Sequence, residues 1–223
     1  MDIPIDNFVA PVCRAQIDFL YQDEHILLIN KPSGLLSLSG KNPLNYDSVH
    51  YRIVQDFPTA MMVHRLDFGT SGIMVLALNK LINAHLTKQF QNREVNKSYV
   101  AILNGELIHE QSVINLPIAK DKPNFPLQKI CWDSGKSALS QYQVLERLNT
   151  PLRTRVLFTP VTGRTHQLRI HSREIGHPIL GCDLYGTEET KNMSERLLLH
   201  ALTLEFNHPV SGERVEGKCP CPF

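Results

Sequence analysis

Short apolar segments that end at glycine, proline or asparagine limit most strongly what this chain can fold into. Residues Ile73–Leu78 form one such segment between Gly72 and Asn79, which is typical of a strand buried inside a sheet. Residues His25–Asn30 predict a second buried strand, because the Lys-Pro-Ser-Gly that follows is a strong turn signal. Both segments are far shorter than the about 20 apolar residues that cross a bilayer. The chain is therefore expected to build a sheet with a buried centre.

The remaining periodicities predict a mixture of strands and helices. Alternation predicts strands over Ser98–Leu103 and Thr154–Pro160, and helical spacing predicts a helix over Leu81–Gln91. Another helix is expected over Thr165–Ile175, with its first residue as N-cap and the glycine that follows as its end. Prolines and lysines are frequent between residues 107 and 136, so this stretch is expected to leave the core on one side. One domain with an elaborated cleft fits this pattern better than two independent domains.

The composition limits the class of protein. The 223 residues carry a formal net charge of +1, with 42% hydrophobic and 20% charged residues, which excludes a disordered or collagen-like chain. A near-neutral charge argues against a polybasic tail, although a local basic face would suffice to bind nucleic acid. Five cysteines do not make a disulfide framework at this size, and the N-terminus lacks the features of a signal peptide. A cytoplasmic protein without membrane attachment is expected.

Three polar segments lie between glycines and apolar strands, and each allows more than one interpretation. The first is His64–Gly72, in which Arg65 and Asp67 precede the central strand. A carboxylate at the end of a strand can serve as a nucleophile, a general base or a metal ligand. It can equally form a structural ion pair with a neighbouring arginine, so this segment alone leaves both interpretations open.

The second segment is Gly163–His171. On a helix, His166, Arg169 and Arg173 share one face, which can bind phosphates or hold a carboxylate in its ionised form. The alternative is a solvent-exposed helix face. It does not explain why Gly163, Thr165 and Gln167 accompany these residues, so a functional site is favoured. The third segment contains Tyr99, which taken alone is more typical of a core residue with a satisfied hydroxyl.

No metal or cofactor motif stands out in the sequence. His166 and His171 are five residues apart, which is not the spacing of a zinc-binding helix, and Cys219 and Cys221 offer only two thiols. The sequence has no phosphate-binding loop, no dinucleotide fingerprint and no nucleophile elbow. No metal and no cofactor are therefore expected.

Taken together, six blocks of the sequence resemble the RluA-type pseudouridine synthases, which isomerise selected uridines in RNA. In chain order they are Asn-Lys-Pro-Ser-Gly-Leu at 30–35, His-Arg-Leu-Asp-x-x-Thr-Ser-Gly at 64–72, Lys-x-Tyr-x-Ala at 97–101, Gly-Arg-Thr-His-Gln-Leu-Arg-x-His at 163–171, Gly-His-Pro-Ile at 176–179 and Leu-Leu-Leu-His-Ala at 197–201. The order of the blocks is highly specific, and the match runs from about Leu20 to Phe223.

The resemblance implies a pseudouridine synthase fold of the α+β class, with a mixed, largely antiparallel sheet, flanking helices and a central RNA-binding cleft. Residues 20–223 would form a single catalytic domain, and residues 1–19 would be an N-terminal extension. One departure lies at Cys182, where the family usually has an aspartate directly after the glycine, whereas here Asp183 comes one residue later. This departure puts a supporting hydrogen bond in question.

Roles for individual residues also follow from the resemblance. Asp67 would be the catalytic aspartate, Arg169 would pair with it and keep it ionised, and Tyr99 would stack on the target uracil and help to remove the C5 proton. Leu66 and Leu198 would line the base pocket. The residues expected to contact the RNA are His64, Arg65, Lys97, Arg164 and His166.

The implied reaction detaches uracil from C1′ of the ribose, rotates the base and rejoins it through C5. It moves no electrons to or from a cofactor and transfers no phosphoryl group, which agrees with the expectation of no cofactor and no metal. The target nucleotide must leave the RNA helix to expose the reacting atoms. Whether Asp67 attacks C1′, adds to the pyrimidine ring or acts as a base on the sugar stays open.

The expected substrates are a 23S ribosomal RNA stem-loop and the tRNA anticodon stem-loop at position 32. Phe-Pro-x-Gln-Lys at 125–129 and Gly-Lys-x-Ala at 135–138 resemble the compact subgroup with this dual use, and the extra N-terminal RNA-binding module of many relatives does not fit before Leu20. A monomer is expected. The alternatives are a synthase for tRNA only or for another 23S site, an RNA-binding protein without catalysis, and a glycosidic hydrolase. A hydrolase would need a second carboxylate near Asp67.

Overall fold

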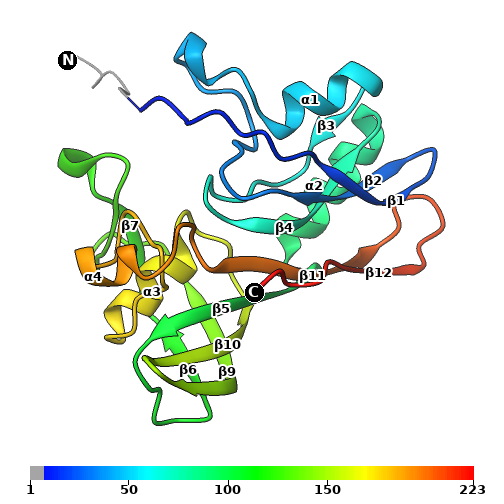
Figure 1. Cartoon of the computed structure of the whole chain (residues 1–223). Coiled ribbons are helices and arrows are strands. Elements are labelled where there is room, and N and C mark those ends of the chain that lie inside the picture. The colour runs from blue at the N-terminus through cyan, green and yellow to red at the C-terminus, as the bar shows by residue number, and fades with distance from the viewer. Residues whose placement is uncertain (1–7) are drawn as a thin grey trace.

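A ten-stranded sheet runs through the part of the protein that the computed structural model describes, residues 8–223 (Figure 1). Its main path has the strand order β1-β2-β4-β11-β5-β10-β9-β6, and β3 and β12 pair beside this path with β4 and β11. The strands are β1 (Asp18–Gln22), β2 (Ile26–Lys31), β3 (Met61–Met62), β4 (Ser71–Ala77), β5 (Asn96–Asn104), β6 (Gln111–Asn115), β9 (Leu139–Asn149), β10 (Leu152–Pro160), β11 (Leu199–Asn207) and β12 (Arg214–Lys218). The β4–β11 pair is parallel and the other named pairs of this sheet are antiparallel, so the sheet is mixed and largely antiparallel, as predicted.

The central strands lie where the sequence predicts them. β2, β4, β5 and β10 cover the four expected segments, with ends that differ by one or two residues. All residues of β4 are buried, which explains why its sequence after Ser71 is continuously apolar instead of alternating. The two buried strands β2 and β4 are direct neighbours in the sheet.

At the start of β4, the backbone of β11 comes so close that only glycine fits. Gly72 has a φ of +114°, and a Cβ atom there would lie 2.2 Å from the carbonyl oxygen of Ala201. This contact belongs to the parallel pairing, in which Ala201 lies opposite Gly72. The glycine that ends the His64–Gly72 block is therefore a requirement of strand pairing.

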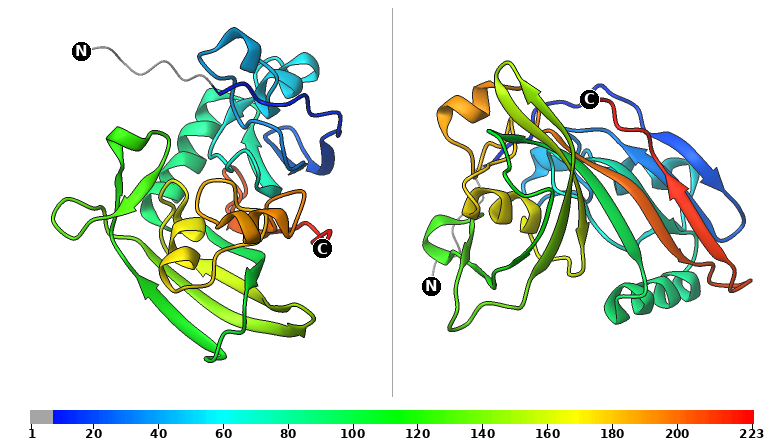
Figure 2. Two further views of the ribbon diagram at one scale, coloured as in Figure 1. Left: turned by 60° about the vertical axis from the view of Figure 1, so that its left-hand side comes forward. Right: turned by 90° about the horizontal axis from the view of Figure 1, so that it is seen from below.

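The helices flank the sheet both beside its N-terminal strands and beside its later strands. They are α1 (Val49–Asp56), α2 (Lys80–Asn92), α3 (Gln167–Glu174) and α4 (Glu188–Asn192), with 3₁₀ turns at Pro43–Asn45 and Lys122–Asn124. Figure 2 shows from two further sides that α1 and α2 accompany the N-terminal strands, whereas α3 and α4 accompany the later ones. α2 confirms the helix expected over Leu81–Gln91.

The start of α3 differs from its prediction. Thr165 is not the N-cap, because the backbone at His166 turns into the left-handed region with a φ of 56° and the helix begins only at Gln167. Gly176 does end the helix as expected, with a φ of +84° and its N–H bonded to the carbonyl of Arg173 at 2.9 Å.

Only part of the stretch between residues 107 and 136 leaves the main sheet, because β6 lies within it and pairs with β9 at the end of the strand order. After β6 it forms a separate two-stranded sheet of β7 (Ile118–Lys120) and β8 (Gln128–Ile130). Figure 1 shows this arm extending from the second half of the molecule beside α3 and α4.

Two clusters of buried apolar residues form the core, one around β2 and β4 and the other around β5, β10 and α3. Tyr99 of β5 packs against both clusters, so it lies where the two halves of the sheet meet. None of the helices formed by residues 8–223 has the length and apolar character that a membrane-spanning helix needs. Of the expected extension 1–19, residues 1–7 lie outside the described residues.

Candidate active site

The loop that carries Asp67 is held in place through its own backbone. Lys31, at the end of β2, is fully buried and its ammonium group donates to the carbonyl of Phe68 at 3.2 Å, as well as to two carbonyls of its own turn. The N–H of Gly34 donates to the same Phe68 carbonyl at 2.9 Å. Burial lowers the pKa of Lys31 to about 7. The 30–35 block therefore anchors the residue that directly follows Asp67.

Two serines extend this anchorage. The Ser33 hydroxyl donates to the carbonyl of Gly69 at 2.7 Å, and the Ser37 hydroxyl donates to the carbonyl of Leu66 at 2.7 Å. In return, the N–H of Leu66 donates to the Ser37 oxygen at 3.1 Å. The backbone on both sides of Asp67 is thus hydrogen-bonded to one neighbouring turn, which leaves the carboxylate side chain free to face the cavity described below.

A buried glutamine shapes the turn that leads into α3. The side-chain oxygen of Gln167 accepts from the Thr162 hydroxyl at 2.7 Å and from the N–H of Arg164 at 2.9 Å. Its amide group donates to the Leu139 carbonyl at 3.1 Å and to the Ser140 hydroxyl at 2.9 Å. All the hydrogen-bonding capacity of this side chain is used, so Gln167 ties the start of α3 to β9 and fixes the direction of the helix.

From α3, Arg169 reaches the Asp67 loop. Its Nη1 atom lies 3.7 Å from Asp67 Oδ2, its Nη2 atom binds Asp183, and its Nε atom donates to the Cys182 sulfur at 3.4 Å. Burial opposes the charge of Arg169, but the neighbouring Cys182, Asp67 and Asp183 outweigh it and raise its pKa. The pairing of Arg169 with Asp67 that the resemblance implies is therefore present in the structure.

The same contacts include the departure from the family pattern at Cys182. Its thiol is buried and accepts from Arg169 Nε, while the carboxylate of the next residue, Asp183, binds the Nη2 group. Both residues at this departure therefore contact Arg169 directly.

Tyr99 is partly buried and lines the same cavity wall region as Asp67. Burial, and then the negative charge of Asp67, raise the pKa of the Tyr99 phenol above its usual value. At neutral pH the side chain therefore carries its proton. It presents an aromatic ring and a hydroxyl donor beside the carboxylate, which is the chemistry expected of a residue that stacks on a base and moves a proton.

One cavity of about 870 Å³ brings these residues together, a size typical of ligand sites. Its walls come from both halves of the molecule: residues 36–40 and 64–70 on one side, and residues 160–169 with Asp183 and Leu184 on the other. The predicted site residues that line it are His64, Arg65, Leu66, Asp67, Lys97, Tyr99, Arg164, His166 and Arg169. Leu198 is not among the lining residues, whereas its neighbour Leu199 is.

The residues expected to contact RNA differ in how available they are. Arg65 is exposed at the cavity, and the guanidinium of Arg164 is held at one edge by donating to the Ser137 carbonyl at 3.0 Å. His166 meets the Tyr185 hydroxyl through Nδ1 at 2.8 Å, and burial lowers its pKa. Burial likewise lowers the pKa of Lys97. A direct contact of each with RNA stays a prediction.

His64 has an internal task in the structure. Its Nε2 atom accepts a hydrogen bond from the N–H of Val75 at 3.1 Å, and its ring stacks on Phe90 with centroids 4.8 Å apart. Burial, and then the charge of Lys97, lower the pKa of His64 to about 3. The ring is therefore neutral and supports the loop next to β4.

The predicted face of α3 is present, although its partner was not foreseen. His166 contacts the Tyr185 ring edge-on, and the guanidinium carbons of Arg169 and Arg173 lie 5.4 and 5.3 Å from the centre of that ring. One aromatic residue thus orders all three side chains. Sequence reasoning also missed Asp183 as a second carboxylate in the cavity. The sequence signal that could have identified Asp183 is its position directly after Cys182, where the chain departs from the family pattern.

Residues 8–223 contain no group of three or more histidine, cysteine, aspartate or glutamate side chains placed to hold one metal ion. The arrangement offers two carboxylates that share a buried arginine, a protonated tyrosine and an apolar wall. These groups can hold a flat polar ring and exchange protons with it.

Comparison with known proteins supports this interpretation. The family model described as RNA pseudouridylate synthase matches residues 25–174. The dual-specificity RNA pseudouridine synthase RluA of Yersinia pestis is 49% identical over 204 residues, covering 92% of this chain and 98% of that protein. The protein of the same name from Escherichia coli (strain K12) is 46% identical over 206 residues, covering 92% and 93%.

A solved structure agrees with the sequence matches. The structure of human RNA pseudouridylate synthase domain containing 1 superimposes with a TM-score of 0.80 at 29% identity, covering 96% of this chain and 86% of that chain. The family and the fold expected from the six sequence blocks are thereby confirmed. The chain belongs to the RNA pseudouridylate synthase family and is an RNA-modifying isomerase with the fold of that family.

Proposed function

We propose that this protein converts uridine to pseudouridine in a 23S ribosomal RNA stem-loop and at position 32 of the tRNA anticodon stem-loop. The observation that carries the chemistry is the meeting of Asp67, Arg169 and Tyr99 in one cavity, although they come from three distant parts of the sequence. The cavity has room for a nucleotide turned out of its helix.

In this proposal Asp67 acts on the uridine while Arg169 stabilises its negative charge. The bond between N1 and C1′ breaks, the uracil rotates, and a bond between C5 and C1′ forms. The proton of C5 leaves and N1 gains one, so the atoms balance without any further reactant. Tyr99 supports the base and relays the C5 proton. Because its phenol is protonated at neutral pH, its oxygen accepts that proton as the hydroxyl gives its own proton to the neighbouring Asp67 carboxylate, from which N1 can be protonated.

Two observations support the dual substrate. The relatives from Yersinia pestis and Escherichia coli, nearly half identical over nine tenths of this chain, carry the name dual-specificity RNA pseudouridine synthase. Pro126, in the block that resembles the compact subgroup, lines the cavity together with the Asp67 loop. This position of Pro126 supports a contact between the β7–β8 arm and the RNA around the target nucleotide.

The proposal includes the organisation of the protein. Residues 20–223 form one catalytic domain, a view supported by the sheet that passes through both core clusters. The enzyme acts as a monomer in the cytoplasm and requires no metal or cofactor. Light scattering of the purified protein tests the monomer, and added chelator tests metal independence: turnover that falls with chelator would contradict it.

Mapping pseudouridine at nucleotide resolution in total RNA tests the proposed substrates. Cells with and without this protein are compared, and the expected result is loss of pseudouridine at one 23S site and at tRNA position 32. Loss in tRNA alone, or at other ribosomal positions, would contradict the dual substrate but retain the activity. An unchanged map would favour a protein that binds RNA without modifying it.

A further inference from the structure

We infer that the segment before β1 belongs to the active site and offers Phe8 as a stacking surface for an RNA base beside the target uridine. This segment, residues 8–17, is called the strap below. It lies in the stretch that the sequence assigns to an N-terminal extension. The inference deepens the proposed function and rests on it.

Phe8 lies at the cavity next to the catalytic loop. It is one of the residues lining the cavity, and 46% of its surface is exposed. Its ring meets that of Phe68 edge-on, with centroids 5.5 Å apart and planes at 78°. Phe68 directly follows Asp67, so the strap contacts the residue adjoining the catalytic aspartate. Part of Phe8 is therefore accessible from the cavity.

Two hydrogen bonds from a buried side chain hold the start of the strap. The side-chain amide of Asn45 donates to the carbonyl of Phe8 at 2.7 Å and accepts from the N–H of Ala10 at 2.8 Å. Asn45 itself is only 4% exposed, so these two bonds satisfy polar groups that have little contact with water. The backbone at Phe8 is therefore held by the fold.

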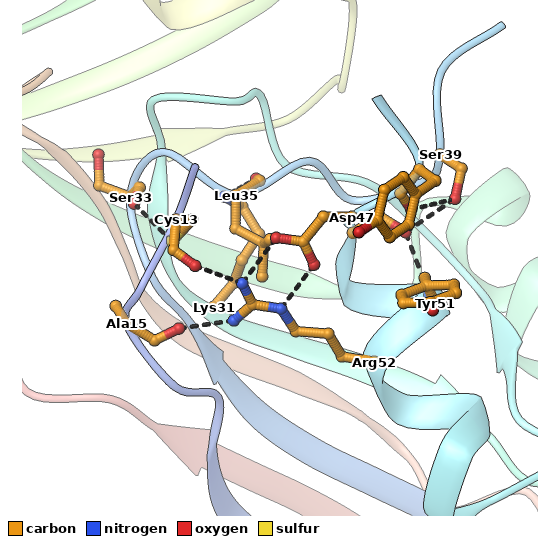
Figure 3. A network of polar contacts seen from close by, with 11 residues as sticks. Cys13, Ala15, Lys31, Ser33, Leu35, Ser39, Asp47, Tyr51 and Arg52 are labelled. Atoms are coloured by element: carbon orange, nitrogen blue, oxygen red, sulfur yellow. Dashed lines mark hydrogen bonds and ion pairs between the residues drawn. The ribbon is translucent and has the colours of Figure 1, made fainter. Parts of the chain in front are cut away.

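Arg52 of α1 fixes the rest of the strap. Figure 3 shows its guanidinium pointing at the strap, where Nη1 donates to the Ala15 carbonyl at 2.6 Å and Nη2 to the Cys13 carbonyl at 2.5 Å. Asp47 holds the other side of the guanidinium with two bonds of 2.7 Å. This hydrogen bonding to Asp47, against the effect of burial, raises the pKa of Arg52. Arg52 is thus charged and links α1 to the strap through hydrogen bonds.

The chemistry of the exposed ring selects its partner. An aromatic ring that lies beside a site for a flipped nucleotide, on a backbone held by hydrogen bonds, is suited to stacking, which every RNA base allows. When one base leaves the loop, its neighbour loses a stacking partner. Phe8 can replace that partner. The ligand is therefore a base next to the target uridine in single-stranded loop RNA.

Turnover of a stem-loop RNA by the full chain tests this inference. Phe8→Ala is expected to raise KM about tenfold, the order of one lost base stack, while kcat changes less than about twofold. Phe8→Tyr should restore the KM, whereas Phe8→Leu should not. Val12→Ala is the matched control, because Val12 lies on the same strap, is 86% exposed and does not line the cavity. Urea unfolding of each variant confirms that the fold is intact.

Removing the hydrogen bonds that Arg52 makes to the strap should have the same effect as removing the Phe8 ring. Arg52→Gln is expected to raise KM, and the double variant Arg52→Gln with Phe8→Ala should be no worse than Phe8→Ala alone. Full recovery by Phe8→Leu, or a KM for Phe8→Ala equal to that of Val12→Ala, would overturn the inference. If the wild type formed no pseudouridine, the proposed function would fail. The RNA affinity of the same variants would then still test the stacking.

Discussion

The guanidinium of Arg169 lies 3.7 Å from the Asp67 carboxylate and reaches it from a buried position. Its side chain is 4% exposed, whereas those of Asp67 and Asp183 are 26% and 60% exposed. One buried cation therefore serves two carboxylates, both of which line the cavity. The two carboxylates remain in contact with water, whereas the arginine does not. Replacing the arginine should therefore change stability and activity differently from replacing the carboxylates.

Replacing the arginine should affect activity far more than stability. Arg169→Met puts an apolar chain of similar length into a buried position and leaves two carboxylates that keep contact with water. The free energy of unfolding should change by no more than about 1 kcal/mol. Turnover of a stem-loop RNA should fall at least about a hundredfold, because the charge of Asp67 loses its partner. Unfolding in urea and single-turnover kinetics measure the two effects, and an active variant would contradict the assigned role.

Removing the carboxylates should be strongly non-additive. Asp67→Asn or Asp183→Asn alone leaves Arg169 with one charged partner, so each should cost at most about 1 kcal/mol of stability. The double variant leaves a buried arginine without a negative partner and should cost about 3–5 kcal/mol. A double-mutant cycle of urea unfolding measures this coupling. Additive losses would show that the two ion pairs are independent.

Tyr99 should separate binding from proton transfer. Tyr99→Phe keeps the ring that packs at the junction of the two core clusters but removes the hydroxyl beside Asp67. RNA affinity should stay within about twofold, while kcat should fall by about a hundredfold or more, the usual range for a lost proton-transfer group. Tyr99→Leu should weaken both. Equal turnover by Tyr99→Phe and wild type would leave the tyrosine with stacking alone.

His64 should make the protein less stable in acid. Its pKa is about 3 in the folded protein, while an unfolded histidine titrates near its ordinary value of 6.5. Between these pH values the unfolded state binds more protons, so the free energy of unfolding falls as pH falls. One proton contributes a slope of up to about 1.4 kcal/mol per pH unit.

Urea unfolding between pH 7 and pH 5 measures the contribution of His64. In His64→Gln the slope with pH should be smaller than in wild type by up to one proton, because glutamine does not titrate. Replacement of His109, which is exposed outside the cavity, is the matched control and should leave the wild-type slope. An unchanged slope in His64→Gln would contradict the burial of a neutral His64 ring as a source of the pH dependence.

The sequence allowed much of the sheet and most of the site to be predicted, for a physical reason. Strands such as β4 are buried on both faces and therefore carry an unbroken apolar sequence, which is visible without any tertiary information. The candidate catalytic residues lie in sequence blocks that contain or adjoin glycines, and the order of these blocks is specific to the family. Asp67, Tyr99 and Arg169 could be chosen in this way before their contacts were known.

What escaped prediction depends on tertiary contacts. α3 does not begin with Thr165 as its N-cap. The backbone at His166 is left-handed instead, because the Gln167 side chain binds Thr162 and the N–H of Arg164. Local N-cap preference does not contain that information. The role of Asp183 arises from Arg169, 14 positions earlier in the chain.

The N-terminal strap illustrates the same limit over a longer distance. Its residues have neither apolar periodicity nor a motif, so the sequence gives no sign that they adjoin the site. The hydrogen bond of Asn45 and the ring contact with Phe68 hold Phe8 at the cavity, and Arg52 holds the residues that follow in the strap. Contacts between residues 35 to 39 positions apart created this part of the site.

Conversion of uridine by Asp67→Asn tests the central claim most directly, since the substitution removes the charge and keeps the shape. Purified wild type and variant are incubated with the 23S and tRNA stem-loops in the presence of chelator, and pseudouridine is counted at each nucleotide. The wild type should convert its target uridines, while the variant should bind the same RNA, unfold at a similar urea concentration and form no pseudouridine. Substantial turnover by the folded variant would contradict Asp67 as the catalytic carboxylate.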